Sequence, residues 1–105
     1  MTVALGFVPL DINVTLARGG DFTSALVASA PWPVGAMIEL RFYVRGSTIA
    51  SAVWSATIVD TQASWDEDVV AVQAVIDANP REVRLHYAEA DGTVLVWGKG
   101  SVHVA

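Results

Sequence analysis

Residues 21–42 constrain the fold most strongly, because two runs of alternating apolar and polar side chains are separated there by Pro31-Trp32-Pro33. Each proline fixes its own φ angle and pushes the residue before it toward extended geometry, so this corner cannot belong to a helix. Alternation with a period of two is typical of half-buried strands. We therefore predict an antiparallel strand pair whose stiff corner holds the Trp32 indole.

Other parts of the chain alternate in the same way. Residues 10–16 and 38–45 alternate strictly, and residues 49–60 form a long extended run rich in β-branched side chains. Runs of this kind, separated by turns that contain glycine, indicate strands. Gly98 and Gly100 predict a bulge or a close backbone approach before the last strand.

The strongest local signal is a hairpin between residues 83–90 and 93–97, with Asp91-Gly92 as a two-residue turn. The turn length determines which residues face one another. The expected opposed pairs are Ala90 with Thr93, Tyr87 with Val96, Leu85 with Gly98, His86 with Trp97 and Ala88 with Leu95. Trp97 is thereby predicted to share a face of the hairpin with His86.

The period changes at Ser64, where the sequence Ser64-Trp65-Asp66-Glu67 fits a capping box. In this motif the serine side chain accepts a free amide of the first helical turn and the glutamate reaches back. Helical spacing follows in the residues Val69, Val72, Gln73 and Ile76, and the dipeptide Asn79-Pro80 ends the run. We predict one helix of at most about four turns.

These elements predict a mainly β protein, an antiparallel Ig-like β-sandwich of about seven strands with one short inserted helix. The sequence contains no βαβ alternation, which would indicate a parallel sheet. With 105 residues, the chain has room for one domain, expected over residues 10–105. Residues 1–9 are expected to be an N-terminal arm or the first strand.

Composition narrows the classes of partner. A net charge of −5 disfavours nucleic acid, whose phosphates need a basic surface. The N-terminal apolar run is short and has no preceding Lys or Arg, so we expect neither a signal peptide nor a membrane span, and a soluble intracellular product. Apolar residues make up 53% of the chain and charged residues only 16%. Some apolar surface is therefore expected to contact another protein.

The residues that carry chemistry do not form a catalytic pattern. The two histidines, His86 and His103, lie in predicted strands, and no serine occupies a nucleophile elbow. We therefore expect no enzyme activity, no cofactor and no metal. The alternatives are a two-histidine metal site completed by Glu89 or Asp91, and a hydrolase built on one histidine.

An acidic cluster precedes the predicted helix. Its members are Asp66, Glu67 and Asp68. Carboxylates at a helix N-terminus interact favourably with the helix dipole, which explains the cluster without a ligand. A calcium site is the alternative, although the spacing lacks the glycine turn and distal glutamate of a known loop.

The four tryptophans are expected to play different parts. Trp54 shares a strand face with small apolar residues and is expected in the core, whereas Trp65 is expected to pack the helix onto a sheet. Trp32 and Trp97 are the candidates for contact with a partner, because aromatic side chains dominate many interfaces and also bind sugars. Packing of both indoles within the domain is the alternative.

Several segments together resemble the LtfC-type β-sandwich domain found among virion proteins of actinobacterial tailed phages. The resemblance covers about residues 10–104 and rests on structural residues. The segments are Arg18-Gly19-Gly20-Asp21-Phe22, Pro31-Trp32-Pro33-Val34-Gly35, Glu39-Leu40-Arg41-Phe42, Trp54-Ser55-Ala56-Thr57, Val83-Arg84-Leu85-His86-Tyr87 and Leu95-Val96-Trp97-Gly98-Lys99-Gly100-Ser101-Val102. The resemblance implies a structural protein of a phage particle.

We therefore expect a virion accessory protein, either a capsid decoration (minor capsid) subunit or a minor tail subunit. It would be made in the host cytoplasm, bind major capsid or tail proteins and form a homo-oligomer in the particle, with no nucleic-acid or membrane partner. The candidate interface residues are Phe7, Val8, Trp32, His86, Leu95 and Trp97. The alternative is a carbohydrate-binding module with Trp32 and Trp97 as sugar platforms on the host surface.

Overall fold

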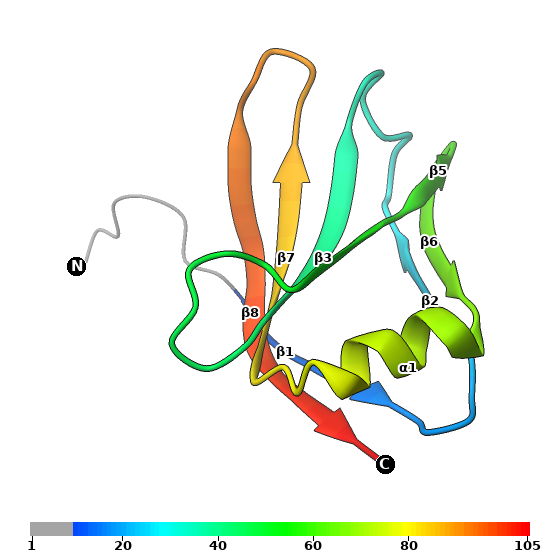
Figure 1. Ribbon diagram of the computed structural model, residues 1–105. Helices are drawn as coiled ribbons and strands as arrows, with labels where there is room; N and C mark the ends of the chain where they lie inside the picture. The colour runs from blue at the N-terminus through cyan, green and yellow to red at the C-terminus, as the bar shows by residue number, and fades with distance from the viewer. Residues whose placement is uncertain (1–9) are drawn as a thin grey trace, which may run out of the picture.

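The computed structural model describes residues 10–105 and has eight strands and one helix in this range (Figure 1). The strands account for most of the ordered structure, so the prediction of a mainly β fold with one short helix is confirmed. The elements are β1 (Leu10–Leu16), β2 (Phe22–Val27), β3 (Met37–Tyr43), β4 (Ala52–Ser55), β5 (Thr57–Val59), β6 (Gln62–Glu67), α1 (Val69–Asp77), β7 (Glu82–Ala88) and β8 (Val94–Val104).

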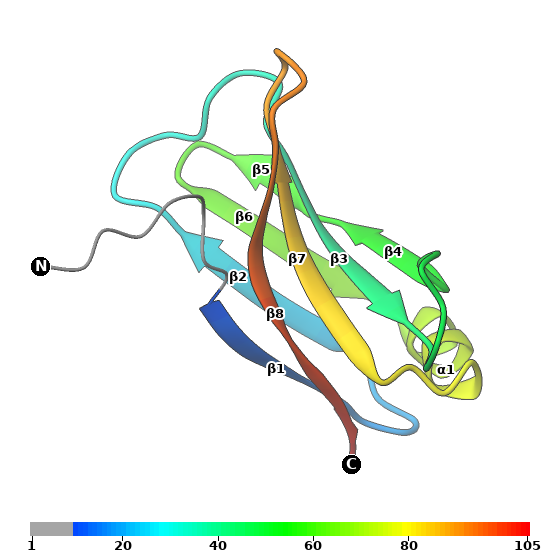
Figure 2. The same cartoon turned by 90° about the vertical axis from the view of Figure 1, so that its left-hand side faces the viewer.

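The strands form two facing sheets, as predicted for a β-sandwich. The larger sheet has the order β1-β8-β7-β3-β4 and the smaller one the order β2-β6-β5. Both views show the sheets as separate layers (Figures 1 and 2). The core between them is formed by the inward-facing side chains of alternating positions, with Phe42, Leu16, Ile38, Val72 and Val83 fully buried.

The prediction that residues 21–42 form a strand pair is wrong, because β2 and β3 belong to different sheets. β2 pairs with β6, and β3 pairs with β4 and β7. The proline-rich corner carries the chain from one layer to the other. Its place is set by distant contacts: the Trp32 backbone N–H donates to Asp60 O at 3.0 Å, and Trp32 Nε1 donates to Thr61 O at 3.1 Å.

The run at residues 49–60 also crosses between layers. It forms β4 in the larger sheet and β5 in the smaller sheet, with Ala56 between them donating its N–H to Ile38 O at 2.8 Å. A continuous chain therefore closes this side of the sandwich. On the opposite side the two edge strands, β1 and β2, are joined only by residues 17–21, at one end.

The pairing of β1 with β8 is parallel, from Leu10 opposite Gly98 to Leu16 opposite Val104. This pair departs from the predicted all-antiparallel arrangement, because side-chain alternation identifies a strand without giving the direction of its neighbour. The predicted close approach is confirmed at Gly100, where a Cβ atom would overlap the backbone of Ile12.

The helix α1 begins later than the capping-box motif predicts. Residues 64–67 belong to β6, and the N-cap is Asp68, whose Oδ1 accepts the Ala71 N–H at 2.9 Å. Trp65 is consequently a buried strand residue that donates Nε1–H to Trp54 O at 2.9 Å. Residues 64–67 pair with β2, and Ser64 pairs with β5 as well, which stabilises this segment as a strand and which a local motif cannot anticipate.

The β7–β8 hairpin has a three-residue loop instead of the predicted two-residue turn. Glu89 N–H donates to Thr93 O at 2.9 Å, Gly92 N–H donates to Glu89 O at 3.0 Å, and Gly92 has a φ of 96°. A left-handed glycine after a tight turn is typical of this loop length. The register near the loop therefore differs by one residue from the prediction, which was wrong about Ala90 and Thr93 as a pair.

A bulge restores the register further along the hairpin. The observed pairs are Ala88 with Val94, Tyr87 with Leu95, His86 with Val96 and, beyond a shift between Leu85 and His86, Leu85 with Gly98. The last pair is the predicted one. Trp97 is the extra residue of the bulge. It contacts Tyr87 on the inner face and does not share the outer face with His86, the arrangement predicted from a two-residue turn.

Candidate protein-binding groove

Three aromatic side chains from two distant parts of the chain meet at one end of the sandwich. Trp97 of β8 stacks on Tyr87 of β7, with ring centroids 4.1 Å apart and planes inclined by 9°. Trp32 lies against both, with centroid distances of 5.7 Å to Trp97 and 6.1 Å to Tyr87. Tyr87 is buried, whereas both indoles are half-buried and retain an accessible side.

The proline-rich corner positions Trp32 in this cluster. Its Nε1–H is used within the domain by Thr61 O, and Gly35, with a φ of 83°, brings the loop against the β7–β8 tip. A Cβ at Gly35 would lie 2.7 Å from Ala90 Cβ, so a side chain at this position would push the corner away from the hairpin.

Beside the aromatic cluster a groove opens between β1 and β2. Figure 2 shows these two strands, each of which is an edge of its sheet. The part of the groove next to the aromatic cluster, which we call its upper part, has a volume of about 500 Å³. It is lined by Leu10, Ile12, Leu26, Val27, Trp32, Leu85 and Trp97. A further hollow of about 310 Å³ continues between the same strands and shares Ile12, Leu26 and Leu85 with it. We call this continuous feature the β1–β2 groove.

The chemistry of the upper β1–β2 groove is apolar. Each of its lining residues has a hydrocarbon or indole side chain, and the Trp32 N–H is already bonded. Sugars are recognised by aromatic faces together with polar side chains that bond to hydroxyls, and apart from the two indoles this part is lined by hydrocarbon side chains. Burial of apolar side chains from another protein is what this surface favours.

Both walls of the groove are also sheet edges. Among the described residues, β1 pairs only with β8, and β2 only with β6. A strand edge offers a row of N–H and C=O groups to an additional extended segment. The groove thus combines an apolar floor with backbone groups that can form a ladder.

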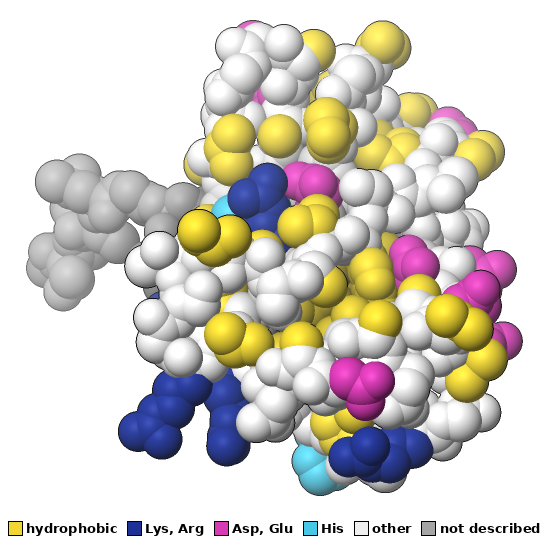
Figure 3. Space-filling view, in the orientation of Figure 1, with side chains coloured by type: hydrophobic (Ala, Val, Ile, Leu, Met, Phe, Trp, Pro, Cys, Tyr) yellow, Lys and Arg dark blue, Asp and Glu magenta, His cyan; other side chains and the backbone are white. Residues whose placement is uncertain are grey.

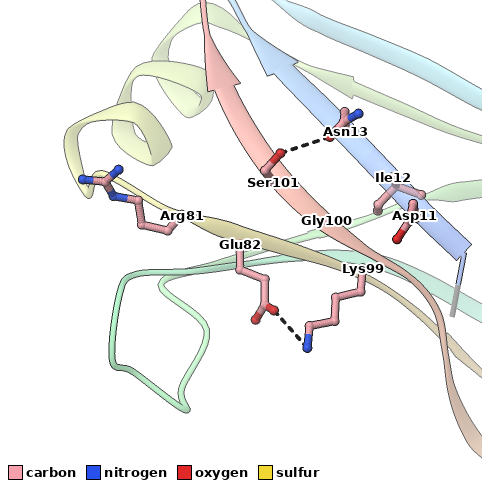
Figure 4. Close-up of a pocket in the computed structure, with 8 residues that line it drawn as sticks. All are labelled: Asp11, Ile12, Asn13, Arg81, Glu82, Lys99, Gly100 and Ser101. Carbon is pink, nitrogen blue, oxygen red and sulfur yellow. Dashed lines mark hydrogen bonds and ion pairs between the residues drawn. The ribbon is translucent and has the colours of Figure 1, made fainter.

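A polar hollow lies on the larger sheet's side away from the core (Figure 4). It contains Lys99 beside Glu82, with Nζ and Oε1 3.4 Å apart, and Ser101 Oγ donating to Asn13 Oδ1 at 3.0 Å. Its volume is about 750 Å³ and it is widely open. Its lining contains two acidic and two basic side chains, Asp11, Glu82, Arg81 and Lys99, so it is not a site of one charge sign.

His86 lies on the outer face of the larger sheet, between β3 and β8. Both of its ring nitrogens are buried and without a hydrogen-bond partner in the described structure. Burial lowers the pKa of His86 below its ordinary value of 6.5, and the Arg41 charge lowers the pKa further. His86 lies on the opposite face of the larger sheet from the aromatic cluster.

The predicted interface residues fall into three groups. Trp32 and Trp97 come together at the β1–β2 groove, and Leu95 opposes Tyr87 on the same inner face. His86 lies on the outer face, and Phe7 and Val8 lie outside the described residues. The sequence analysis missed the strand residues that complete the groove, Leu10, Ile12, Leu26, Val27 and Leu85.

Exposed hydrophobic side chains occur at several other places. Figure 3 shows separate apolar patches, interrupted by basic and acidic groups, on the side where β4 passes into β5. The most exposed large hydrophobic residues are Val34, Ile49, Val27, Val70 and Leu10. Two of these, Val27 and Leu10, line the β1–β2 groove, whereas Val70 lines a separate hollow on α1 together with Gln73 and Asp77.

The described part of the chain contains neither a metal-binding cluster nor a membrane-spanning helix. Within residues 10–105, no three His, Asp or Glu side chains come close enough to hold a metal ion. No helix in this range has the length and apolar character needed to cross a membrane.

Two packed sheets around one apolar core define the protein as a β-sandwich domain. A family model described as LtfC-like, beta-sandwich domain matches residues 9–105, and the chain belongs to this family. This finding confirms the resemblance stated from the sequence. Comparison with curated proteins finds no match.

Proposed function

We propose that the protein is a structural accessory component of a bacteriophage particle, either a capsid decoration (minor capsid) subunit or a minor tail subunit. It acts by binding major capsid or tail proteins and reinforcing the particle. The observation that carries this proposal is the β1–β2 groove, where apolar side chains face the same opening as two strand edges that have no partner strand within residues 10–105. The resemblance to LtfC-type domains of phage virion proteins supplies the biological setting.

The energetics of the groove support a protein partner. Leu10 and Val27 are 72% and 74% exposed, although each borders the half-buried Trp32 and Trp97. Covering such apolar surface yields about 25 cal/mol for each Å² removed from water, so a partner that covers these side chains is stabilised there. Repeated copies on a symmetric shell or tube present the same patch many times, which allows modest contacts to reinforce the assembly.

Carbohydrate binding has weaker support. A sugar platform needs an indole that faces solvent beside polar groups, whereas Trp32 and Trp97 border hydrocarbon side chains. The polar hollow of Figure 4 has suitable hydroxyl and amide groups, but no aromatic side chain lines it. The two components of a sugar site are therefore apart.

The test compares purified protein added to capsids and, separately, to tails that lack it, with location by cryo-electron microscopy. The informative variant is Val27→Asp, which places a charge in the groove at an exposed position. Val34→Asp is the matched control, because Val34 is 97% exposed and outside the groove. We expect regular density for wild type and V34D, and at least a tenfold loss of occupancy for V27D.

Two outcomes contradict the proposal. Binding of V27D equal to that of wild type rules out the groove as the contact. Binding of wild type to neither capsids nor tails, together with retention on host-surface glycans, replaces the virion role by the carbohydrate alternative.

A further inference from the structure

We propose that the β1–β2 groove binds residues 2–8 of a second copy of this chain as an added strand along β2, so that copies assemble by strand exchange. This inference concerns the same groove as the proposed function. It does not need the virion assignment, because it is tested on the purified protein alone.

The free edge of β2 has the length needed to pair with an added strand. β2 has six residues, all paired with β6 on one side, and its other edge borders the groove. Six residues of strand extend about 20 Å, which a segment of seven residues spans completely. The smaller sheet has three strands against five in the larger one, so a further strand beside β2 brings the two layers closer to equal width.

The apolar sequence of residues 2–8 matches the apolar lining of the groove. Residues 1–9 lie outside the described residues, and their sequence contains no charged side chain. In an extended conformation Val3, Leu5 and Phe7 would share one face. Three large apolar side chains at alternate positions fit a groove whose upper floor is formed by Ile12, Leu26 and Leu85. Pro9, which cannot donate to a ladder, then ends the added strand.

The direction in which the chain enters β1 favours a second copy as the source of the added strand. β1 and β2 run in opposite directions because residues 17–21 join them at one end, and Leu10 and Val27 lie together at the other end. For the chain before Leu10 to lie on β2 of its own copy, it has to reverse direction at once. Residues 6–9 would form that reversal, and Phe7 would be lost from the strand. A second copy delivers residues 2–8 without this turn.

The first experiment measures the molar mass of the full chain in solution by light scattering over a range of concentrations. We expect wild type to form dimers or larger species and the double variant L5D/F7D to be monomeric, with at least a tenfold weaker association. The matched control is A4D/V8D, which adds the same charge on the opposite face of the segment and is expected to associate as wild type does. Circular dichroism of each variant checks that the fold is retained.

The second experiment separates exchange between copies from folding back within one copy. The chain has no cysteine, so introduced cysteines react without competition. Protein with Leu5→Cys is mixed with protein carrying Val27→Cys and treated with a short thiol cross-linker. A product containing both chains supports the proposal.

The opposite results are equally clear. A monomeric wild type at every concentration overturns the proposal. So does a chain with both cysteines that cross-links only within itself. If self-association fails while V27D still prevents particle binding, the groove belongs to another protein and only the strand exchange is rejected.

Discussion

Trp97 stacks on Tyr87, with ring centroids 4.1 Å apart. A two-residue turn would place Trp97 opposite His86 on the outer face, whereas in the observed register Leu95 opposes Tyr87 and Trp97 lies two residues further along the same face of β8. There the indole forms one wall of the β1–β2 groove. The loop length thus connects the hairpin geometry to the candidate binding surface.

Trp97 is expected to contribute to folding as well as to binding. Replacing Trp97 with Ala removes the stack on Tyr87 and the contact with Trp32, and we expect a loss of about 2–4 kcal/mol in the free energy of unfolding. Urea denaturation measures it. W97F retains an aromatic ring and is expected to lose less than half as much. Equal stability of W97A and wild type would show that the stack contributes nothing.

Gly100 is expected to tolerate no side chain. A Cβ there would overlap the Ile12 backbone across the parallel β1–β8 pair, so G100A should destabilise the domain by about 1–3 kcal/mol. The control is G20A, whose Cβ meets Ala17 at ordinary contact distances of 3.5 Å or more. Thermal unfolding of both variants provides the comparison. A G100A midpoint at or above that of G20A is incompatible with the close approach.

Asp68 is expected to stabilise the start of α1. Its Oδ1 accepts the Ala71 N–H, and loss of an N-cap acceptor in D68A should cost about 1 kcal/mol. D68N retains an acceptor oxygen and is expected to stay within about 0.5 kcal/mol of wild type. The measurement is the denaturation midpoint of the three proteins. If S64A lowers stability more than D68A does, the capping box at Ser64 is the better description.

His86 is expected to make stability depend on pH. Burial, and then Arg41 and Arg84, lower its pKa in the folded state, while Glu39 acts in the opposite direction. The unfolded chain therefore binds a proton more readily, so stability falls as pH decreases below the ordinary value of 6.5. In H86Q this part of the decrease should be absent from unfolding curves measured from pH 7 downward. H103Q keeps His86 and serves as control; an equal slope in H86Q and wild type contradicts the assignment.

Elements that depend on neighbouring residues could be predicted from the sequence. Alternation located the strands at residues 10–16 and 38–45, and Asn79-Pro80 located the end of the helix, where Asn79 has a φ of 56°. The same analysis was wrong about the partner of β2 and the start of α1. In both cases pairing between distant residues decided the outcome.

The candidate site shows the same division. Trp32 and Trp97 were identified from residue type and context, and both border the β1–β2 groove. Leu26 and Val27 were not identified, because nothing in a strand sequence says whether it will be at a sheet edge. A two-residue turn places His86 and Trp97 on the same face of the hairpin. The observed loop has three residues, and this shift of one residue places Trp97 on the inner face instead.

The sequence by itself determined the class of structure, since alternating side chains, two prolines around Trp32 and a single helical period permit little except a β-sandwich. Tertiary structure alone decided that β1 runs parallel to β8, that the corner crosses between layers and that β1 and β2 are edge strands among the described residues. The physical reason is range: backbone conformation follows from neighbouring residues, whereas strand order and edge exposure follow from which surfaces bury one another across the whole chain.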